Sequence, residues 1–326
     1  MEKLYSLIQK FVQAEPWELF ESEDVFFVQS PADGIMYLCS VMGNGGEEFG
    51  INAFRGAQGM RNFEKMLDHD PEGPMDRNLM FELDMLAINL CTRDYMDKKD
   101  LKITKNLMLT FRGGEWPLIR SYRPHYYPYF LTETEIEALC DCLQQILELY
   151  EEGEMAVEQI RTLAPGEMVV RCKEDSSWIS RIVNIGYATK EDIPEIHLDD
   201  STIKRLLSLP ASGLNEMIDL VHLPAVIEDP APPHYGLMLL GIDPQNIANE
   251  YGLFQPFQDY LQESCEKIVQ AFLARGSKPG FILLREDSPL ADCFETIAKL
   301  VDIKFEKVDE LLFISEFLDS MESTMS

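Results

Sequence analysis

The sequence predicts an α+β protein with mixed sheets, built from two related hairpin–helix–strand–helix–strand modules. Apolar runs of strand length alternate with segments of helical spacing. Several of the runs are joined by turns short enough for antiparallel hairpins. A strand–helix–strand passage near the C-terminal end, whose helix is expected to begin at Ser288 and Pro289, allows a parallel pair. With 326 residues, of which 46% are hydrophobic, the chain is long enough for two ordinary domains with sizeable cores.

The first third of the chain alternates predicted helices and strands. Its N-terminal segment places leucine, isoleucine and phenylalanine on one helical face and has no cleavage site of a signal peptide. We expect a helix there, strands over 24–29, 34–42, 47–54, 79–90 and 107–111, helices over 56–67 and 93–106, and a polar loop over 68–78.

The stretch "SVMGNGGEEFGINAFRG", residues 40–56, first suggests a phosphate-binding loop. Such a loop needs a helix directly after the glycines and usually a lysine. Here an alternating, strand-like run follows, and Glu47 and Glu48 would repel an anion. Asn44-Gly45 is a strong signal for a two-residue hairpin turn. The sequence therefore predicts a β-hairpin.

The second half of the chain is similar to the first when the two are offset by 202 positions. "GIMYLCSVMGNGGEEFGINAF" then lies over "GLMLLGIDPQNIANEYGLFQP". Asn44 falls on Asn246 and Gly50 on Gly252. This agreement indicates an internal duplication. The alternative is that any two hairpin-plus-helix units look alike.

Three segments are expected from this comparison: an N-terminal α+β module over 1–131, a connecting helix over 132–161, and a C-terminal α+β module over 162–326. Thr132 and Glu135 form the pattern of a capping box and mark the start of the helix.

The charge balance excludes some classes of partner. The chain has 57 acidic and 28 basic residues, a formal net charge of -29. Such a surface repels phosphate backbones and anionic lipids, so we expect neither nucleic-acid nor membrane binding. An acidic face for a basic partner stays open. Seven widely spaced cysteines without metal-ligand spacing indicate reduced thiols, a cytoplasmic protein and no cofactor.

The segment "FRGGEWPLIRSYRPHYYPYF", residues 111–130, is predicted as a loop and combines arginines with aromatic side chains within an acidic chain. Arginine binds carboxylate or phosphate in a bidentate manner and stacks on rings. The candidate ligand-binding residues are Arg112, Trp116, Arg120, Arg123, His125 and Tyr126. The alternative is that the aromatic residues hold a crossover against the core while the arginines pair with acids.

Two weaker sites are also predicted. Arg55 and Gly56 stand where a strand passes into a helix, so free amides there form a candidate anion site. Asp243, Glu286 and Asp287 follow strands and are candidate ligands for a divalent metal, as in nuclease-like sheets. Abundant acids and polar strand ends explain the same residues without a metal.

The stretches "GIMYLCSVMGNGGEEFGINAFRG" and "FRGGEWPLIRSYRPHYYPYFLTETEIEAL" resemble those of an uncharacterised bacterial two-domain family. The resemblance implies an N-terminal domain of unknown function, a second such domain over about 160–320, and a bacterial cytoplasmic protein. It implies no catalytic residues. We therefore expect a binding or adaptor protein for an anionic or protein ligand. The alternative is a metal-dependent hydrolase or nuclease-like enzyme.

Overall fold

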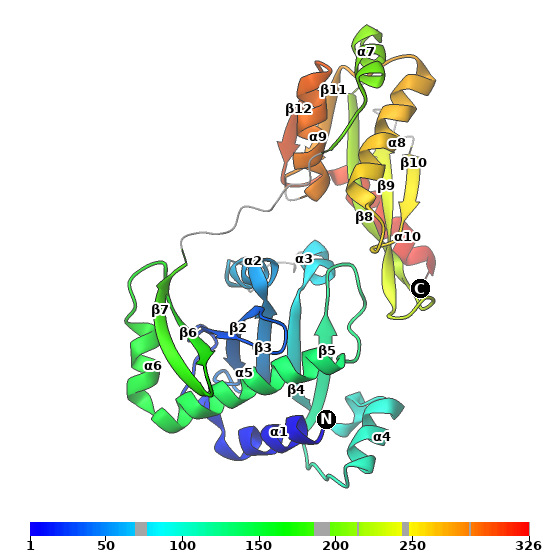
Figure 1. Cartoon of the computed structure of the whole chain (residues 1–326). Helices are drawn as coiled ribbons and strands as arrows, with labels where there is room; N and C mark the ends of the chain where they lie inside the picture. Colours follow the sequence, from blue (N-terminus) through cyan, green and yellow to red (C-terminus); the bar gives the residue numbers. More distant parts are fainter. Residues whose placement is uncertain (69–76, 186–195, 214, 243–247, 287, 326) are drawn as a thin grey trace. The chain divides into compact units, whose positions relative to one another are not determined.

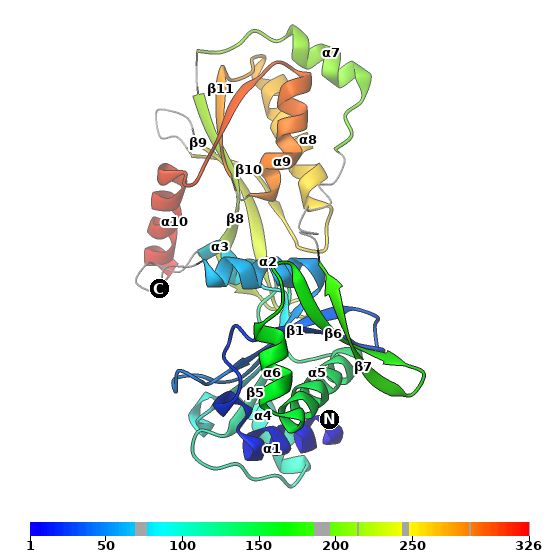
Figure 2. The same cartoon turned by 90° about the vertical axis from the view of Figure 1, so that its left-hand side faces the viewer.

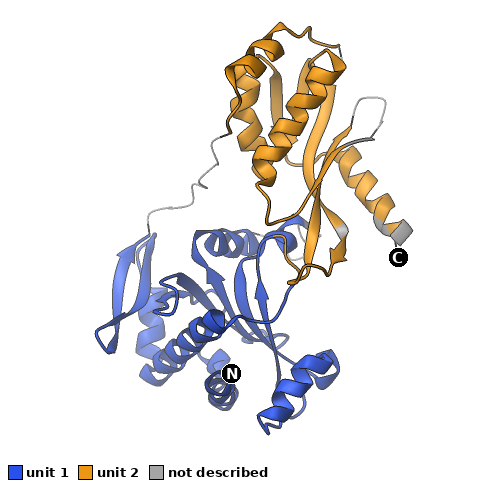
Figure 3. Ribbon diagram, turned by 45° about the vertical axis from the view of Figure 1, so that its right-hand side comes forward, with its two compact units in different colours: residues 1–124, 128–189 blue, residues 125–127, 190–326 orange. Residues whose placement is uncertain are grey.

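The computed structural model describes residues 1–68, 77–185, 196–213, 215–242, 248–286 and 288–325. The chain forms two compact units, coloured separately in Figure 3. Unit 1 contains residues 1–124 and 128–189, and unit 2 contains residues 125–127 and 190–326. The chain therefore passes between the units at three places, and three residues from its first half belong to unit 2.

Unit 1 is a seven-stranded mixed sheet with helices on both faces (Figure 1). The strand order is β5-β4-β3-β2-β1-β6-β7, in which only β1 and β6 are parallel. Helices α1 and α5 pack on one face, and α2 and α3 cover the other. The elements are α1 (Glu2–Ala14), η1 (Pro16–Glu18), β1 (Phe26–Gln29), β2 (Met36–Met42), β3 (Phe49–Arg55), α2 (Gly56–Leu67), α3 (Arg77–Glu82), β4 (Met85–Cys91), η2 (Arg93–Tyr95), α4 (Lys98–Asn106), β5 (Trp116–Tyr122), α5 (Glu133–Glu152), α6 (Glu154–Arg161), β6 (Glu167–Glu174) and β7 (Ser177–Asn184).

Unit 2 is a five-stranded mixed sheet in the order β10-β9-β8-β11-β12. Strands β8, β11 and β12 are parallel, and the remaining pairs are antiparallel. Helices α8 and α9 lie side by side on one face (Figure 2), and α10 covers the other. The elements are α7 (Asp200–Ser208), β8 (Asn215–Ile227), β9 (His234–Ile242), β10 (Ala248–Phe254), α8 (Tyr260–Arg275), β11 (Phe281–Arg285), α9 (Pro289–Leu300), β12 (Lys304–Val308) and α10 (Leu312–Met325).

The glycine-rich stretch forms the predicted hairpin between β2 and β3, but the connection spans residues 43–48 instead of two residues. The Gly46 N–H donates to the Gly43 carbonyl over 2.9 Å, with Asn44-Gly45 at the centre of the turn. In β3, Gly50 has a φ of 154°, and a Cβ there would lie 1.9 Å from the carbonyl oxygen of Ile88. This glycine is required because the backbone of β4 passes too close for any side chain.

Three local predictions were wrong in unit 1. Residues 107–111 form no strand, whereas residues 116–122, predicted as loop, form β5. β5 lies beside β4 at the edge of the sheet, where a proline such as Pro117 is tolerated. The predicted strand over 79–90 begins as helix α3 and becomes β4 only from Met85. The predicted loop over 68–78 lies largely outside the described residues.

The expected connecting helix over 132–161 lies within unit 1. It consists of α5 and α6, which meet at Gly153 with a φ of 81°. The capping box is present: Thr132 accepts from the Glu135 N–H, and Glu135 accepts from the Thr132 N–H. Ten residues of α5 are buried, because the helix crosses the sheet and packs on α1.

The strand orders do not show the predicted duplication. At the predicted offset of 202, residues 79–84 fall on 281–286, yet residues 77–82 form helix α3 whereas residues 281–285 form strand β11. The units share a different pattern: β3-β2-β1-β6 and β10-β9-β8-β11 are both three-strand meanders with a parallel strand beside the first. By this pattern α5 corresponds to α8, and β4, α4 and β5 extend one edge of the sheet in unit 1.

Candidate functional site

The central polar cluster of unit 1 is built around Glu135, which is 5% exposed. One carboxylate oxygen accepts from Arg55 Nη2 at 2.8 Å, Ser121 Oγ at 2.7 Å and Arg123 Nη2 at 3.0 Å. The other accepts from the backbone N and Oγ1 of Thr132. Burial by itself raises the pKa of Glu135, but hydrogen bonds from Thr132, Ser121 and Arg123 lower it to about 2. Glu135 is therefore an ionised internal anchor for two arginines.

Arg55 also pairs with a second acid. Its Nη1 lies 2.8 Å from Asp84 Oδ1, and its backbone N–H donates to the Asp84 carbonyl. Burial raises the pKa of Asp84 to about 6, although Arg55 opposes this shift. Arg55 and Arg123, expected at separate sites, are thus brought together on Glu135. Gly56, with a φ of 57°, begins α2 directly after Arg55. The guanidinium of Arg55 already pairs with Asp84 and Glu135.

Arg120 makes a separate, equally complete set of contacts. Its guanidinium binds both carboxylate oxygens of Asp100, at 3.0 and 2.7 Å, and Asp97 at 3.2 Å. It also lies 4.6 Å from the ring centroid of Phe130, and Lys99 Nζ lies 3.6 Å from the same centroid. These contacts hold segment 111–130 against α4, which is the structural alternative raised from the sequence.

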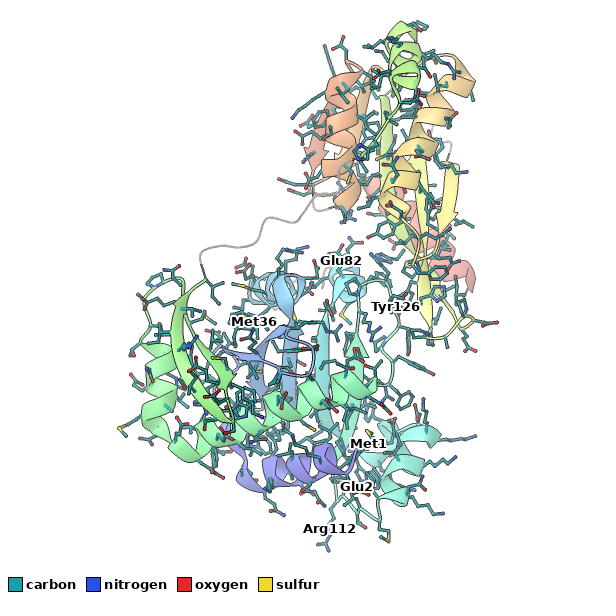
Figure 4. The ribbon with its side chains drawn as sticks, viewed as in Figure 1. Met1, Glu2, Met36, Glu82, Arg112 and Tyr126 are labelled. Carbon is teal, nitrogen blue, oxygen red and sulfur yellow. The ribbon has the colours of Figure 1, made fainter. Side chains whose placement is uncertain are left out.

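Arg112 and Trp116 lie away from both arginine clusters. The half-buried ring of Trp116 packs 5.8 Å from Phe111, and the guanidinium of Arg93 lies 5.8 Å from its centroid. Arg112 is exposed on a turn, and Figure 4 shows its side chain extending away from unit 1. The six predicted ligand-binding residues therefore do not converge on one site.

His125 belongs to unit 2, where it joins a buried histidine pair. Its Nδ1 lies 2.8 Å from His222 Nε2, and its Nε2 lies 2.9 Å from the Tyr260 hydroxyl. Burial lowers the pKa of His125 to about 4. Burial, with His125 and Arg285 nearby, lowers the pKa of His222 to about 2. Both imidazoles are therefore neutral at pH 7.

The histidine pair is expected to make the stability of unit 2 depend on pH. Both folded pKa values lie below the ordinary 6.5, so the stabilisation is present above pH 6.5 and is lost as the pH falls toward 4. From pH 7 to pH 5, the urea midpoint followed by far-UV circular dichroism should fall. The fall should be smaller in His222→Gln and unchanged in His197→Gln, which replaces an exposed histidine. Equal falls in all three proteins would contradict this assignment.

Five rings of unit 2 form what we call the aromatic cluster. Tyr126 forms an antiparallel bridge with His234, and the Tyr127 N–H donates to the carbonyl of Pro233. Ring centroids lie 6.1 Å apart for Tyr126 and His234, 5.9 Å for His234 and Phe257, and 6.1 Å for Tyr127 and Tyr235. His234 is 1% exposed, whereas Tyr127 is 46% and Phe257 59% exposed. Figure 4 labels Tyr126.

One of the three predicted metal ligands, Glu286, lies among the described residues. Asp243 and Asp287 lie outside the described residues, and Glu286 is exposed at the end of β11. In the part of the chain that the structure describes, no three histidine, cysteine or acidic side chains are grouped to hold a metal ion. The acid at the centre of the sheet, Asp219, pairs with Arg285 at 2.8 Å.

Comparison with known proteins identifies the family. A model described as a domain of unknown function (DUF7309) matches residues 2–171, just over half of the chain. The chain belongs to this family. A second domain of unknown function (DUF6930) matches residues 202–322, so the two-domain resemblance expected from the sequence is confirmed. No curated protein and no solved structure shows significant similarity.

This DUF7309 protein contains contacts that sequence patterns did not indicate. Asp84 and Asp100 were not singled out as partners of arginines, and Glu135 was recognised only as a helix cap. Tyr127 lay in the aromatic segment but was not selected, and Phe257 follows a proline with no distinguishing pattern. No helix among the described residues is long and apolar enough to cross a membrane.

Proposed function

We propose that this DUF7309 protein is a binding or adaptor protein that takes a protein ligand through the aromatic cluster of unit 2. The observation that carries this proposal is that two rings of the cluster are exposed: Phe257, which packs on the buried His234, and Tyr127, which packs on Tyr235. Aromatic side chains lose little conformational entropy on binding and often dominate interface energetics.

The charges around the cluster favour a ligand segment that carries arginine or lysine. The flanking stretches 226–235 and 254–260 contain three acids, Glu228, Asp229 and Asp259, and no lysine or arginine. All three acids are exposed. A guanidinium can stack on a tyrosine or phenylalanine ring while it pairs with a carboxylate. A basic ligand therefore fits better than the small anion suggested by the sequence, because internal acids already bind Arg55, Arg120 and Arg123.

We further propose that the protein works in the cytoplasm. The seven cysteines form no disulfide among the described residues, and six of them are buried. Free thiols persist in reducing compartments, whereas secreted proteins tend to pair them. The resemblance noted from the sequence makes this a bacterial cytoplasm. No contact among the described residues favours the metal-dependent hydrolase as a second function.

A fluorescein-labelled peptide of alternating arginine and glycine tests the proposal by fluorescence anisotropy. The double variant Tyr127→Ala, Phe257→Ala should bind about ten-fold more weakly than the parent protein. Tyr95→Ala, which removes a 74% exposed tyrosine of unit 1, should bind like the parent. If the peptide fails to bind the parent, or binds all three proteins equally, the aromatic cluster is not the ligand site.

A further inference from the structure

Unit 1 contains a groove that none of the contacts described above explains. Its volume is about 610 Å³, within the range of small-molecule sites. Three carboxylates of α5 line it, those of Glu133, Glu137 and Asp141, together with Lys3 from α1 and Lys173 from β6. Met1, which also lines the groove, is labelled in Figure 4.

The acids are arranged in a regular row. Positions 133, 137 and 141 lie four residues apart on one face of α5, which spaces successive side chains by about 6 Å along the helix axis. Ile136 and Cys140 also line the groove and add apolar surface beside this row. The Ser30 hydroxyl donates to Asp141 Oδ2 at 2.9 Å and orients that carboxylate.

The charges of opposite sign in the groove do not neutralise one another by contact. Across the described residues, neither Lys3 nor Lys173 forms an ion pair with the three carboxylates. Elsewhere in unit 1 the buried arginines bind acids directly, as Arg120 binds Asp100. The groove therefore presents both a negative row and three positive groups, those of Lys3, Lys173 and the Met1 N-terminus, to a ligand.

We propose that this groove binds a basic amino acid, or a short peptide that combines a lysine or arginine side chain with a free carboxylate. Three carboxylates, with the ammonium groups of Lys3, Lys173 and the Met1 N-terminus, complement a ligand with two cationic groups and one anionic group. The two amines of L-lysine are separated by five carbon atoms, close to the spacing of neighbouring carboxylates on α5. Lys3 or Lys173 would bind the ligand carboxylate, and Ile136 would contact its methylene groups.

Isothermal titration calorimetry on the full chain with three probes tests the assignment. L-lysine has both amines and the carboxylate, cadaverine lacks the carboxylate, and 6-aminohexanoic acid lacks the α-amine. L-lysine should bind, and each analogue should bind about ten-fold more weakly. Absence of heat with L-lysine at millimolar concentration overturns the proposal. Equal binding of cadaverine would show that the groove is only an acidic patch and would also overturn it.

Variants locate the site within the groove. Glu137→Gln should weaken L-lysine binding about ten-fold, and Lys173→Gln should weaken binding of L-lysine but not of cadaverine. Glu151→Gln, which removes an exposed acid near the other end of α5, should leave both affinities unchanged. Unaltered L-lysine binding in Glu137→Gln overturns the assignment. The Tyr127→Ala, Phe257→Ala protein should still bind L-lysine, so this result is independent of the proposed protein ligand.

Discussion

Glu135→Gln is expected to destabilise unit 1 by about 3–5 kcal/mol at pH 7. The substitution leaves Arg55, whose side chain is 15% exposed, and Arg123 without their shared carboxylate. Because the folded pKa of Glu135 is about 2 against an ordinary 4.5, its stabilisation is present above pH 4.5 and is lost as the pH falls toward 2. The difference in free energy of unfolding between the parent protein and Glu135→Gln should therefore become smaller as the pH falls below 4.5.

Tryptophan fluorescence during urea unfolding measures this effect in unit 1 alone, because all three tryptophans lie there: Trp17, Trp116 and Trp178. Glu151→Gln, on the same helix but exposed, is the matched control and should change stability by no more than about 0.5 kcal/mol. If Glu135→Gln shifts the transition no further than this control, the cluster does not stabilise unit 1.

Arg285→Met should destabilise unit 2 to a similar extent, by about 3–5 kcal/mol. It leaves Asp219, 2% exposed, as an uncompensated buried carboxylate. Burial already raises the pKa of Asp219 in the parent, with Arg285 opposing the shift. Without Arg285 the folded pKa rises further, so the loss should be larger at pH 8 than at pH 5, where more of the carboxyl group is protonated.

Two optical signals separate this result from a general loss of folding. Far-UV circular dichroism reports on both units, so its transition should shift, while the tryptophan transition, which reports on unit 1 alone, stays in place. Lys304→Met, on neighbouring β12 and exposed, is the matched control. Asp219→Asn combined with Arg285→Met should recover part of the loss, because no unpaired charge is left. If the double variant is as unstable as Arg285→Met, the ion pair is not the cause.

Local signals predicted the parts of the fold that local chemistry determines. Asn44-Gly45 marked the β2–β3 turn, Thr132 and Glu135 marked the start of α5, and Pro289 marked the start of α9. The parallel pairing of β11 and β12 also followed from the helix between them. Strand order was not predictable, because the choice of neighbour for β11 depends on contacts among distant segments.

The candidate sites show the same division. The arginines of segment 111–130 were visible in the sequence, but their partners were not. Asp84 and Glu135 lie 29 and 80 positions from Arg55, and the chain has 57 acids from which to choose. The sequence therefore indicated the arginines, but only the fold showed that Arg55, Arg120 and Arg123 already bind acids of the same protein.

Residues 125–127 belong to unit 2 but are synthesised within unit 1, which affects the order in which the two units can fold. During synthesis, His125 leaves the ribosome 97 positions before His222, its partner. If unit 1 folds during synthesis, His125–Tyr127 leave the ribosome before the strands of unit 2 that they contact have been made. If the chain were cut between residues 171 and 202, where the two family matches end and begin, the second fragment would lack residues 125–127 of unit 2. We therefore expect unit 2 to fold completely only when residues 125–127 are present with it.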